Sequence, residues 1–319
     1  MTTPIPVYLD CDTGVDDAVA LAYLIRSPNV ELVGVGTVSG NTSAAQAARN
    51  TLDLLALAGR DDIPVAVGTH DHSTRPFGGG AAHVHGDNGI GGIQLPRAAR
   101  EPDPRSAQDL LIALSHEYAG RLHVVTIGPL TNLGNALGAD PALATRVAGV
   151  TTMGGAALAP GNISPVAEAN VYNDPEAADA LLTADWDVTL VPLDVTMEHT
   201  LSEDERIVLE ESADPFLSAV GRMLDHYFDF YLPIYGTRTS ALHDPLAAVI
   251  AAGGVALTNA PRVPVRVDTT AGPGRGQTIA DLRGQRRGAR DHDHVRTRVV
   301  LEVDTDVAPH LMAVLTAGR

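Results

Sequence analysis

Lysine is absent from this chain of 319 residues, and cysteine occurs only once, as Cys11. The missing lysine excludes Schiff-base chemistry and the phosphate-binding lysine of Walker-type and kinase sites. A single cysteine excludes both an intramolecular disulfide and a zinc site built from cysteines. These two absences narrow the available chemistry before any motif is considered.

Positive charge is also scarce, because 22 basic residues face 39 acidic ones and leave a formal net charge of −17. This balance argues against a nucleic-acid partner and against an anionic membrane surface, since both require clustered basic side chains. The sequence has no apolar run near the 18 residues of a membrane-spanning helix. Residues 1–4 do not resemble the start of a signal peptide, so we expect a cytoplasmic protein with no membrane partner.

Alternating strand and helix signals run along the whole chain. Apolar, β-branched segments predict strands over residues 5–9, 31–38, 63–67, 122–127, 147–153, 188–195 and 295–303. Ala- and Leu-rich segments predict helices over residues 18–24, 42–58, 109–118, 129–137, 174–182, 216–231, 245–252 and 308–315. We therefore expect an α/β fold, a single domain over residues 1–319 whose mostly parallel central sheet is covered by helices on both faces.

Four carboxylates lie within eight residues where the first expected strand ends, namely Asp10, Asp12, Asp16 and Asp17. Ligands of open α/β sheets bind at this edge. Carboxylates this close repel one another unless a cation neutralises them, and hard cations prefer oxygen ligands. The alternative is an acidic first turn that complements the helix dipole.

Two further strand ends carry polar groups or a sharp break. Asn41 follows the second expected strand, and residues 126–132 interrupt a strand in a way that can expose a backbone carbonyl to a metal. Each segment, taken alone, also fits a helix cap or a turn.

Amides and a carboxylate come together in residues 161–170, as Asn162, Glu168 and Asn170. Sugar hydroxyls need both hydrogen-bond donors and acceptors, which this set supplies. The alternative is an ordinary loop.

Two histidines are candidates for proton transfer. His243 precedes Asp244 at the start of an expected helix, and His85 lies in the Gly- and His-rich segment 69–93. Asp244 followed by Pro245 also fits a simple N-cap with proline in the first helical position.

Taken in order, these motifs resemble one known family. The segments DCDTGVDDAVAL, IGPLTN, GNISPVAEANVYNDPEAA and ALHDP are similar to those of the inosine-uridine-preferring nucleoside hydrolases, from residue 10 to about residue 248. Each motif alone is weak, but the ordered set is specific. The resemblance implies a hydrolase that splits the N-glycosidic bond of a purine or pyrimidine ribonucleoside into base and ribose, in nucleoside salvage.

The resemblance also implies a Ca²⁺ cofactor and the groups that act in catalysis. The Ca²⁺ would be held by three carboxylates and one backbone carbonyl, those of Asp12, Asp17, Asp244 and Ile127. Asp12 would also be the general base, and His243 the acid that protonates the leaving base, helped by His85. Asp10 would orient these groups.

The ribose would be bound mainly by polar side chains. By resemblance these are Asp16 and Asn170 at the 2′-hydroxyl, Asp244 and Asn41 on the 3′ side, and Asn162 and Glu168 at the 5′-hydroxyl, with Met153 under the sugar. Carboxylates in these places suit the oxocarbenium-like transition state of N-glycoside cleavage.

The base preference is open at this point. The purine-specific branch uses stacked tryptophans, whereas this chain has one, Trp186, away from the motifs. We therefore favour a pyrimidine-preferring or nonspecific enzyme, expected by resemblance to form a homodimer or homotetramer.

A catalytically silent ribose or nucleoside binder is the alternative. A haloacid-dehalogenase-like phosphatase fits less well, because Thr13-Gly14 reverses its motif and its downstream lysine is missing.

Overall fold

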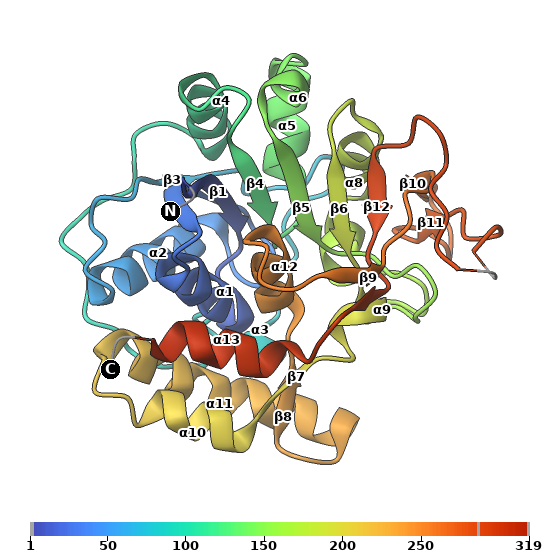
Figure 1. Cartoon of the computed structure of the whole chain (residues 1–319). Helices are drawn as coiled ribbons and strands as arrows, with labels where there is room; N and C mark the ends of the chain where they lie inside the picture. The colour runs from blue at the N-terminus through green and yellow to red at the C-terminus, as the bar shows by residue number, and fades with distance from the viewer. Residues whose placement is uncertain (1–2, 286–287, 318–319) are drawn as a thin grey trace.

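The computed structural model describes residues 3–285 and 288–317, and these form an α/β fold (Figure 1). Seven strands make one sheet in the order β12-β6-β5-β4-β1-β2-β3, and all of its neighbouring pairs are parallel. These strands are β1 (Ile5–Cys11), β2 (Val30–Thr37), β3 (Val65–Val67), β4 (His123–Thr126), β5 (Gly149–Met153), β6 (Val188–Val191) and β12 (Thr297–Val299). The expected parallel sheet is confirmed.

Helices flank the sheet, and short antiparallel pairs extend the fold beyond it. The longer helices are α1 (Val15–Arg26), α2 (Ala44–Leu57), α4 (Ala107–Glu117), α5 (Thr131–Ala139), α8 (Pro175–Thr183), α10 (Glu203–Glu210), α11 (Pro215–Tyr235), α12 (His243–Ala251) and α13 (Val307–Thr316). The short ones are α3 (Ala82–His85), α6 (Leu143–Arg146), α7 (Ala169–Asn173) and α9 (Leu193–Thr196). The small pairs join β7 (Thr200–Ser202) to β8 (Thr239–Ala241), β9 (Leu257–Asn259) to β13 (Glu302–Val303), and β10 (Val265–Val267) to β11 (Thr278–Ala280).

Two apolar clusters cover the two faces of the sheet. One packs α1, α2, α11, α12 and α13 on one face, and the other packs α4, α5 and α8 on the opposite face. Alternate residues of β1 divide between them, since Val7 and Leu9 belong to the first cluster and Tyr8 to the second. Helices on both faces are therefore confirmed.

The strand order reverses between β1 and β4, because β1 neighbours both β2 and β4. Ligands of doubly wound sheets bind outside the carboxyl ends of the strands at such a reversal. The acidic segment after β1 and the break after β4 both lie there. The topology thus brings the predicted motifs to one place.

Two expected strands are shorter than predicted. The segment predicted as residues 188–195 ends at Val191, because Pro192 lacks an N–H for the ladder and precedes the short helix α9. The segment 295–303 divides into β12 and β13, which pair with β6 and β9 in different sheets. A β-branched run does not by itself specify its partner strand.

Two long Gly-rich segments contain short regular elements. Residues 69–93 include α3, and residues 269–293 include β11, although residues 286–287 of that segment lie outside the described residues.

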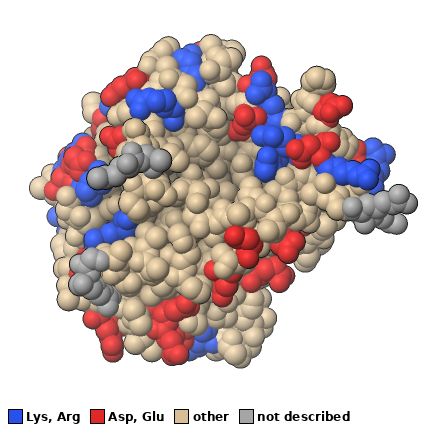
Figure 2. Space-filling view, viewed as in Figure 1, with Lys and Arg blue, Asp and Glu red and all other residues tan. Residues whose placement is uncertain are grey.

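Among the described helices, none is long and apolar enough to cross a membrane. In Figure 2, acidic side chains gather on the lower part of the face shown, and basic ones occur there in smaller separate groups.

Candidate active site

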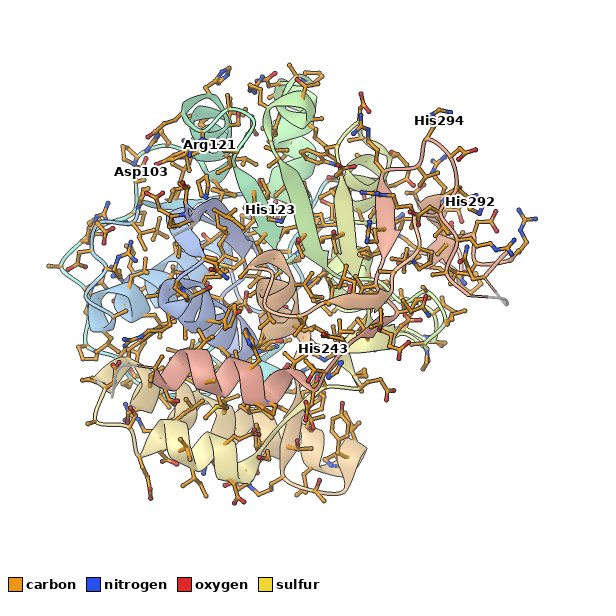
Figure 3. The ribbon with its side chains drawn as sticks, viewed as in Figure 1. Asp103, Arg121, His123, His243, His292 and His294 are labelled. Carbon is orange, nitrogen blue, oxygen red and sulfur yellow. The ribbon has the colours of Figure 1, made fainter. Side chains whose placement is uncertain are left out.

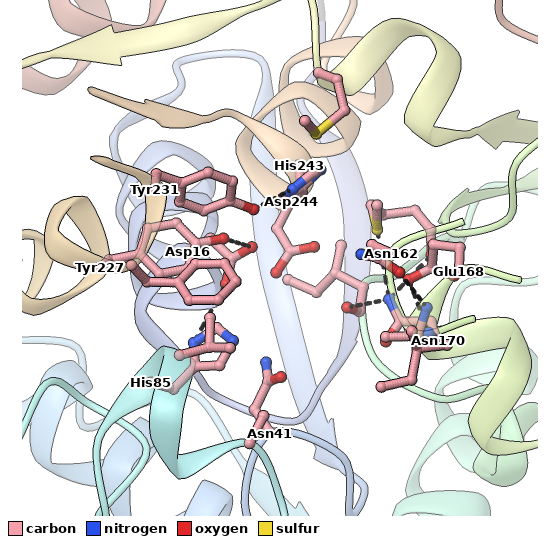
Figure 4. A pocket seen from close by; sticks show the side chains of 18 of the residues that line it. Asp16, Asn41, His85, Asn162, Glu168, Asn170, Tyr227, Tyr231, His243 and Asp244 are labelled. Carbon is pink, nitrogen blue, oxygen red and sulfur yellow. Dashed lines mark hydrogen bonds and ion pairs between the residues drawn. The ribbon is translucent and has the colours of Figure 1, made fainter. Parts of the chain in front are cut away.

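A cavity of about 350 Å³ lies at the carboxyl ends of β1, β4 and β5. Its lining includes every predicted site residue except Asp12 and Asp17, which lie directly behind it. In Figure 4, Asn162, Glu168 and Asn170 occupy one side, and Tyr227, Tyr231 and His85 occupy the other, with Asp16 beside Tyr227 and Asp244 between the two sides. We call the first side, together with the acidic residues Asp12, Asp16 and Asp17, the sugar half, and the second side the base half, after the ribose and the base expected there.

The turn from β1 into α1 carries the acidic cluster and is strained at Thr13. The φ angle of Thr13 is +22°, a region that β-branched residues rarely adopt. The Thr13 hydroxyl lies 2.7 Å from that of Thr51, and the Asn50 amide donates to the Thr13 carbonyl at 3.3 Å. Such strain persists where surrounding contacts fix it, and it is common at functional sites.

Backbone N–H groups hold Asp12 and Asp17 in this turn. The Asn41 N–H donates to Asp12 Oδ2 at 2.6 Å, and the Gly14 N–H donates to Asp17 Oδ2 at 2.7 Å. A Cβ atom on Gly40 would lie 2.0 Å from Asp12 Oδ2, so glycine is required for this close approach. Asn41 also donates its side-chain amide to both carboxylates, and Ser43 rather than Asn41 caps α2. The predicted alternative of a helix cap at Asn41 is therefore wrong.

One oxygen from each of Asp16, Asp17 and Asp244 lies within 4.8 Å of the other two, and all three residues are buried. Burial raises the pKa of each carboxyl, and for Asp17 and Asp244 the nearby Asp16 raises it further, to about 7 in the case of Asp17. The Asp16 Oδ1 atom is buried and has no hydrogen-bond partner among the described residues. A cation with oxygen ligands fits this donor set, because it neutralises the crowded negative charges.

The remaining predicted metal ligands lie next to this group. The Asp12 N–H donates to Asp17 Oδ1 at 3.2 Å, and the Ile127 carbonyl lines the pocket while it accepts a hydrogen bond from the Asn170 amide at 2.9 Å. Asp244 is not the N-cap of α12, since the helix begins at His243 and Leu242 stands at the cap position. Its carboxylate is thus available to the pocket, and that alternative reading of Asp244 is wrong.

On the sugar half, the polar side chains are aligned by the backbone. Glu168 caps α7, and it accepts from the N–H groups of Gly155, Asn170 and Val171 at 2.8–3.1 Å. The Asn162 carbonyl oxygen accepts from the Ala169 N–H at 2.9 Å, which leaves its amide N–H₂ group for a ligand. These side chains therefore have one fixed orientation each.

On the base half, side chains hold one another. The Tyr227 hydroxyl donates to Asp16 Oδ2 at 2.9 Å, and its ring lies 5.3 Å from that of His85. His243 lies between two hydroxyls, with Nδ1 2.7 Å from Thr196 and Nε2 2.6 Å from Tyr231. Thr196 was not predicted and gives no sequence signal. From the sequence, Tyr227, Tyr231 and Tyr235 lie ahead of His243, so one of them could cover the base, although the helical spacing of Tyr227 and Tyr231 fits a core stripe as well.

The two buried histidines of the pocket, His85 and His243, are neutral near pH 7. Burial lowers the pKa of His243 to about 4 and that of His85 to about 3. The Val15 N–H donates to His85 Nδ1 at 3.1 Å, so the neutral ring carries its proton on Nε2. His85 is thereby a fixed hydrogen-bond donor at the pocket rather than a charged group.

Asp10 lies behind the site, as expected for an orienting residue. Its carboxylate accepts from the Asn132 amide at 3.0 and 3.2 Å and from the Tyr8 hydroxyl at 3.1 Å. Asn132 in turn accepts from the Thr69 N–H at 2.9 Å. This buried network ties the end of β1 to α5 and to the segment after β3. The role of Asn132 was not predicted.

Comparisons with known proteins agree with this geometry. Residues 7–308 match the family described as "Inosine-uridine preferring nucleoside hydrolase". "Uridine nucleosidase 1" of Arabidopsis thaliana is 37% identical over 245 residues, which cover 76% of this chain and 72% of that protein.

Two solved structures share the fold over nearly their full length. "Plant nucleoside hydrolase - PpNRh1 enzyme" has a TM-score of 0.91 at 32% identity, and covers 99% of this chain and 100% of its own. "Purine-Preferring Ribonucleoside Hydrolase from Gardnerella vaginalis" has a TM-score of 0.89 at 32% identity, with coverage of 97% and 98%.

Proposed function

Because this chain belongs to the inosine-uridine preferring nucleoside hydrolase family, and is therefore a hydrolase of N-glycosyl bonds, we propose that it is a Ca²⁺-dependent ribonucleoside hydrolase with a pyrimidine preference or none. The observation that carries the proposal is the shared pocket. Three buried carboxylates meet there beside the amides and the carboxylate that suit a ribose. One relative is named a uridine nucleosidase, and one solved structure with the same fold is named a purine-preferring hydrolase. The base preference of this chain therefore needs its own evidence.

The cation proposed for this site would be held by Asp12, Asp17, Asp244 and the Ile127 carbonyl. When bound, Ca²⁺ supplies the positive charge that orients the ribose hydroxyls and lowers the pKa of the attacking water. The orphaned Asp16 oxygen is left for the 2′-hydroxyl, together with Asn170. Asn41 and Asp244 serve the 3′ side, and Met153 packs under the ring.

The reaction has two parts, departure of the base and attack by water, and different residues serve each part. Water adds to the anomeric carbon while the C–N bond breaks and its electron pair leaves with the base. Asp12 takes a proton from that water. Buried carboxylates near the ribose stabilise the positive charge that develops on it. Glu168 and Asn162 hold the 5′-hydroxyl and keep the ring in place.

In this proposal His243 serves as the acid for the departing base. The resting ring is neutral and donates a hydrogen bond to the base, and it transfers a proton only after it has itself taken one up from solvent. Its Nε2 contact with Tyr231 directs the ring toward the base half, and Thr196 fixes the ring from the other side. His85, with its proton on Nε2, is a second donor to the base. Hydrogen-bond donors at this point lower the barrier because negative charge builds on the leaving base.

The test is reducing-sugar release from uridine, cytidine, inosine and adenosine, each with added Ca²⁺ and with a chelator. Release that requires Ca²⁺ is the expected result, with uridine hydrolysed at least as fast as inosine. Nucleoside binding without release would support the silent-binder alternative. Equal release with chelator and with Ca²⁺ would contradict the metal assignment alone.

Assembly and location stay predictions. A homodimer or homotetramer, and a cytoplasmic enzyme of nucleoside salvage, are tested by light scattering on the purified protein and by cell fractionation.

A further inference from the structure

The segment that carries Asn162 has little support from the hydrophobic core. Ala156 and Ala167 are buried, but none of residues 157–166, all of which the structure describes, is buried. Asn162 itself lines the pocket and yet is exposed. A segment with few buried contacts keeps one position only where polar contacts hold it. The place of Asn162 in the sugar half (Figure 4) therefore depends on the hydrogen bonds of this segment.

One carboxylate supplies three of those hydrogen bonds. Asp194 Oδ2 accepts from the Ala157 N–H at 2.8 Å, and Asp194 Oδ1 accepts from the N–H groups of Leu158 and Ala159 at 2.6 and 3.1 Å. Hydrogen bonds to an ionised carboxylate are about twice as strong as neutral ones. Each bond also restricts the backbone of one residue. Asp194 thus fixes a turn that ends three residues before Asn162.

Asp194 is itself presented by a rigid part of the fold. It lies on α9, which follows directly after β6, and its neighbour Leu193 is buried in the core. The Leu193 N–H donates to the Gly155 carbonyl at 2.9 Å, and the Gly154 N–H donates to the Val191 carbonyl at 3.2 Å. The carboxylate is therefore held still on the sheet side, while the turn that it binds is exposed.

The second side chain at the 5′ end of the sugar half does not depend on Asp194. Glu168 is buried, caps α7 and accepts from three backbone N–H groups. Asn162 is tied at its side chain by the Ala169 N–H alone among the contacts of the described residues. Loss of the Asp194 contacts should therefore displace Asn162 and leave Glu168 in place.

We infer that Asp194 is a positioning residue that holds the Asn162 amide at the 5′-hydroxyl of the ribose. The inference rests on the proposed nucleoside hydrolase function and on the 5′ role proposed for Asn162. Asp194 does not line the cavity, so it acts only through the turn that it binds. None of the sequence motifs singled it out.

The first experiment compares kcat/KM for uridine and 5′-deoxyuridine in Asp194→Ala and Asp194→Asn. Asp194→Ala should lower the value for uridine by about fivefold, the scale of one neutral hydrogen bond. The value for 5′-deoxyuridine should change by less than about 1.5-fold, because Asn162 has no hydroxyl to bind there. Asp194→Asn keeps an oxygen for Leu158 and Ala159, so its loss should be smaller. Equal losses on both substrates, as a fold defect would give, overturn the inference.

The second experiment asks whether Asp194 acts through Asn162. Asn162→Ala alone should also lower kcat/KM for uridine by about fivefold. Adding Asp194→Ala to that variant should cost less than about twofold more, whereas two independent residues would multiply their losses to about 25-fold. Losses that multiply overturn the inference.

The matched control is Asp304→Ala. Asp304 Oδ1 also accepts from the backbone N–H of a distant residue, Ala256, at 3.0 Å, but neither residue lines the pocket. Its ratio of uridine to 5′-deoxyuridine hydrolysis should equal that of the wild type. A ratio in Asp194→Ala no different from that of Asp304→Ala also overturns the inference.

A binding measurement separates this failure from failure of the proposed function. Dissociation constants for uridine and 5′-deoxyuridine, measured by calorimetry, report the 5′-hydroxyl contact whether or not ribose is released. A wild type that binds both without hydrolysis defeats the proposed function. The inference then stands if Asp194→Ala weakens binding of uridine alone. It falls if both nucleosides lose affinity equally, if neither does, or if the wild type binds neither.

Discussion

The two halves of the pocket are held in place by different kinds of contact. On the sugar half, backbone N–H groups orient Glu168, Asn162 and Asp12, so these side chains are fixed by the course of the chain itself. On the base half, His85 also accepts from a backbone N–H, that of Val15, but the other contacts join side chains, as in the Tyr231–His243 hydrogen bond and the Phe230–His83 ring contact. Ribose is common to every nucleoside, whereas the base varies. The fold therefore fixes what is constant, and leaves to replaceable side chains what differs between substrates.

The largest effect is expected at the sugar half. Asp12→Asn should lower kcat by at least about a thousandfold for all nucleosides alike, since it removes the proposed general base. The Asn41 N–H still has an oxygen to bond, so the fold should persist, as checked by circular dichroism. A near-normal rate would remove Asp12 from this role.

His243→Ala should act on the base half and should depend on the leaving group. We expect about a hundredfold loss with inosine and uridine, but less than about tenfold with 4-nitrophenyl riboside, whose leaving group needs no proton. Steady-state rates on the three substrates check this. Equal losses on all of them would count against proton delivery from His243. They would also count against the claim that the base half acts specifically on the leaving group.

Glu168→Gln should give a smaller loss that does not depend on the base. Weakening a charge-assisted hydrogen bond to the 5′-hydroxyl should lower kcat/KM by about tenfold for uridine and inosine equally. With 5′-deoxyuridine the loss should disappear, because the hydroxyl is gone. A loss that differs between the two bases would break the division into two halves.

The smallest effect concerns a histidine outside both halves. His123 lies on β4, well apart from His243 in Figure 3, and burial lowers its pKa to about 4. The unfolded ring takes up its proton near pH 6.5, so between about pH 6.5 and 4 the unfolded state binds more protons. The free energy of unfolding should therefore fall as the pH is lowered through this range, by up to about 1.4 kcal/mol per pH unit from this group.

His123→Asn should reduce that slope without changing the ratio of uridine to inosine hydrolysis. Urea unfolding at several pH values checks the slope. An unchanged slope would mean that His123 does not titrate differently in the two states.

The sequence predicts the sugar half better than the base half, for a physical reason. Asp12, Asp16 and Asp17 are close in sequence, and strand ends of a parallel sheet converge at one edge, so local motifs suffice to locate them. Phe230 and His83 are separated by 147 positions and meet only when α11 packs against α3. Neither residue carries a local signal of this contact, because an aromatic on a helix first reads as core.

Element boundaries show the same limit. Asp244 before Pro245 reads as an N-cap with the helix starting at Pro245, yet α12 begins two residues earlier, at His243. Likewise β12 and β13 share one β-branched run, and only their partners β6 and β9 separate them. The period of a segment predicts its type, whereas its neighbours in space decide where it ends.

Trp186 has a practical consequence. It is the single tryptophan of the chain, it is 2% exposed, and its indole N–H donates to the Leu181 carbonyl at 2.8 Å, outside the pocket lining. Emission excited at the tryptophan band should thus report global unfolding and remain silent to nucleoside binding. The protein carries a built-in fluorophore that distinguishes a variant that has lost its fold from one that has only lost its ligand.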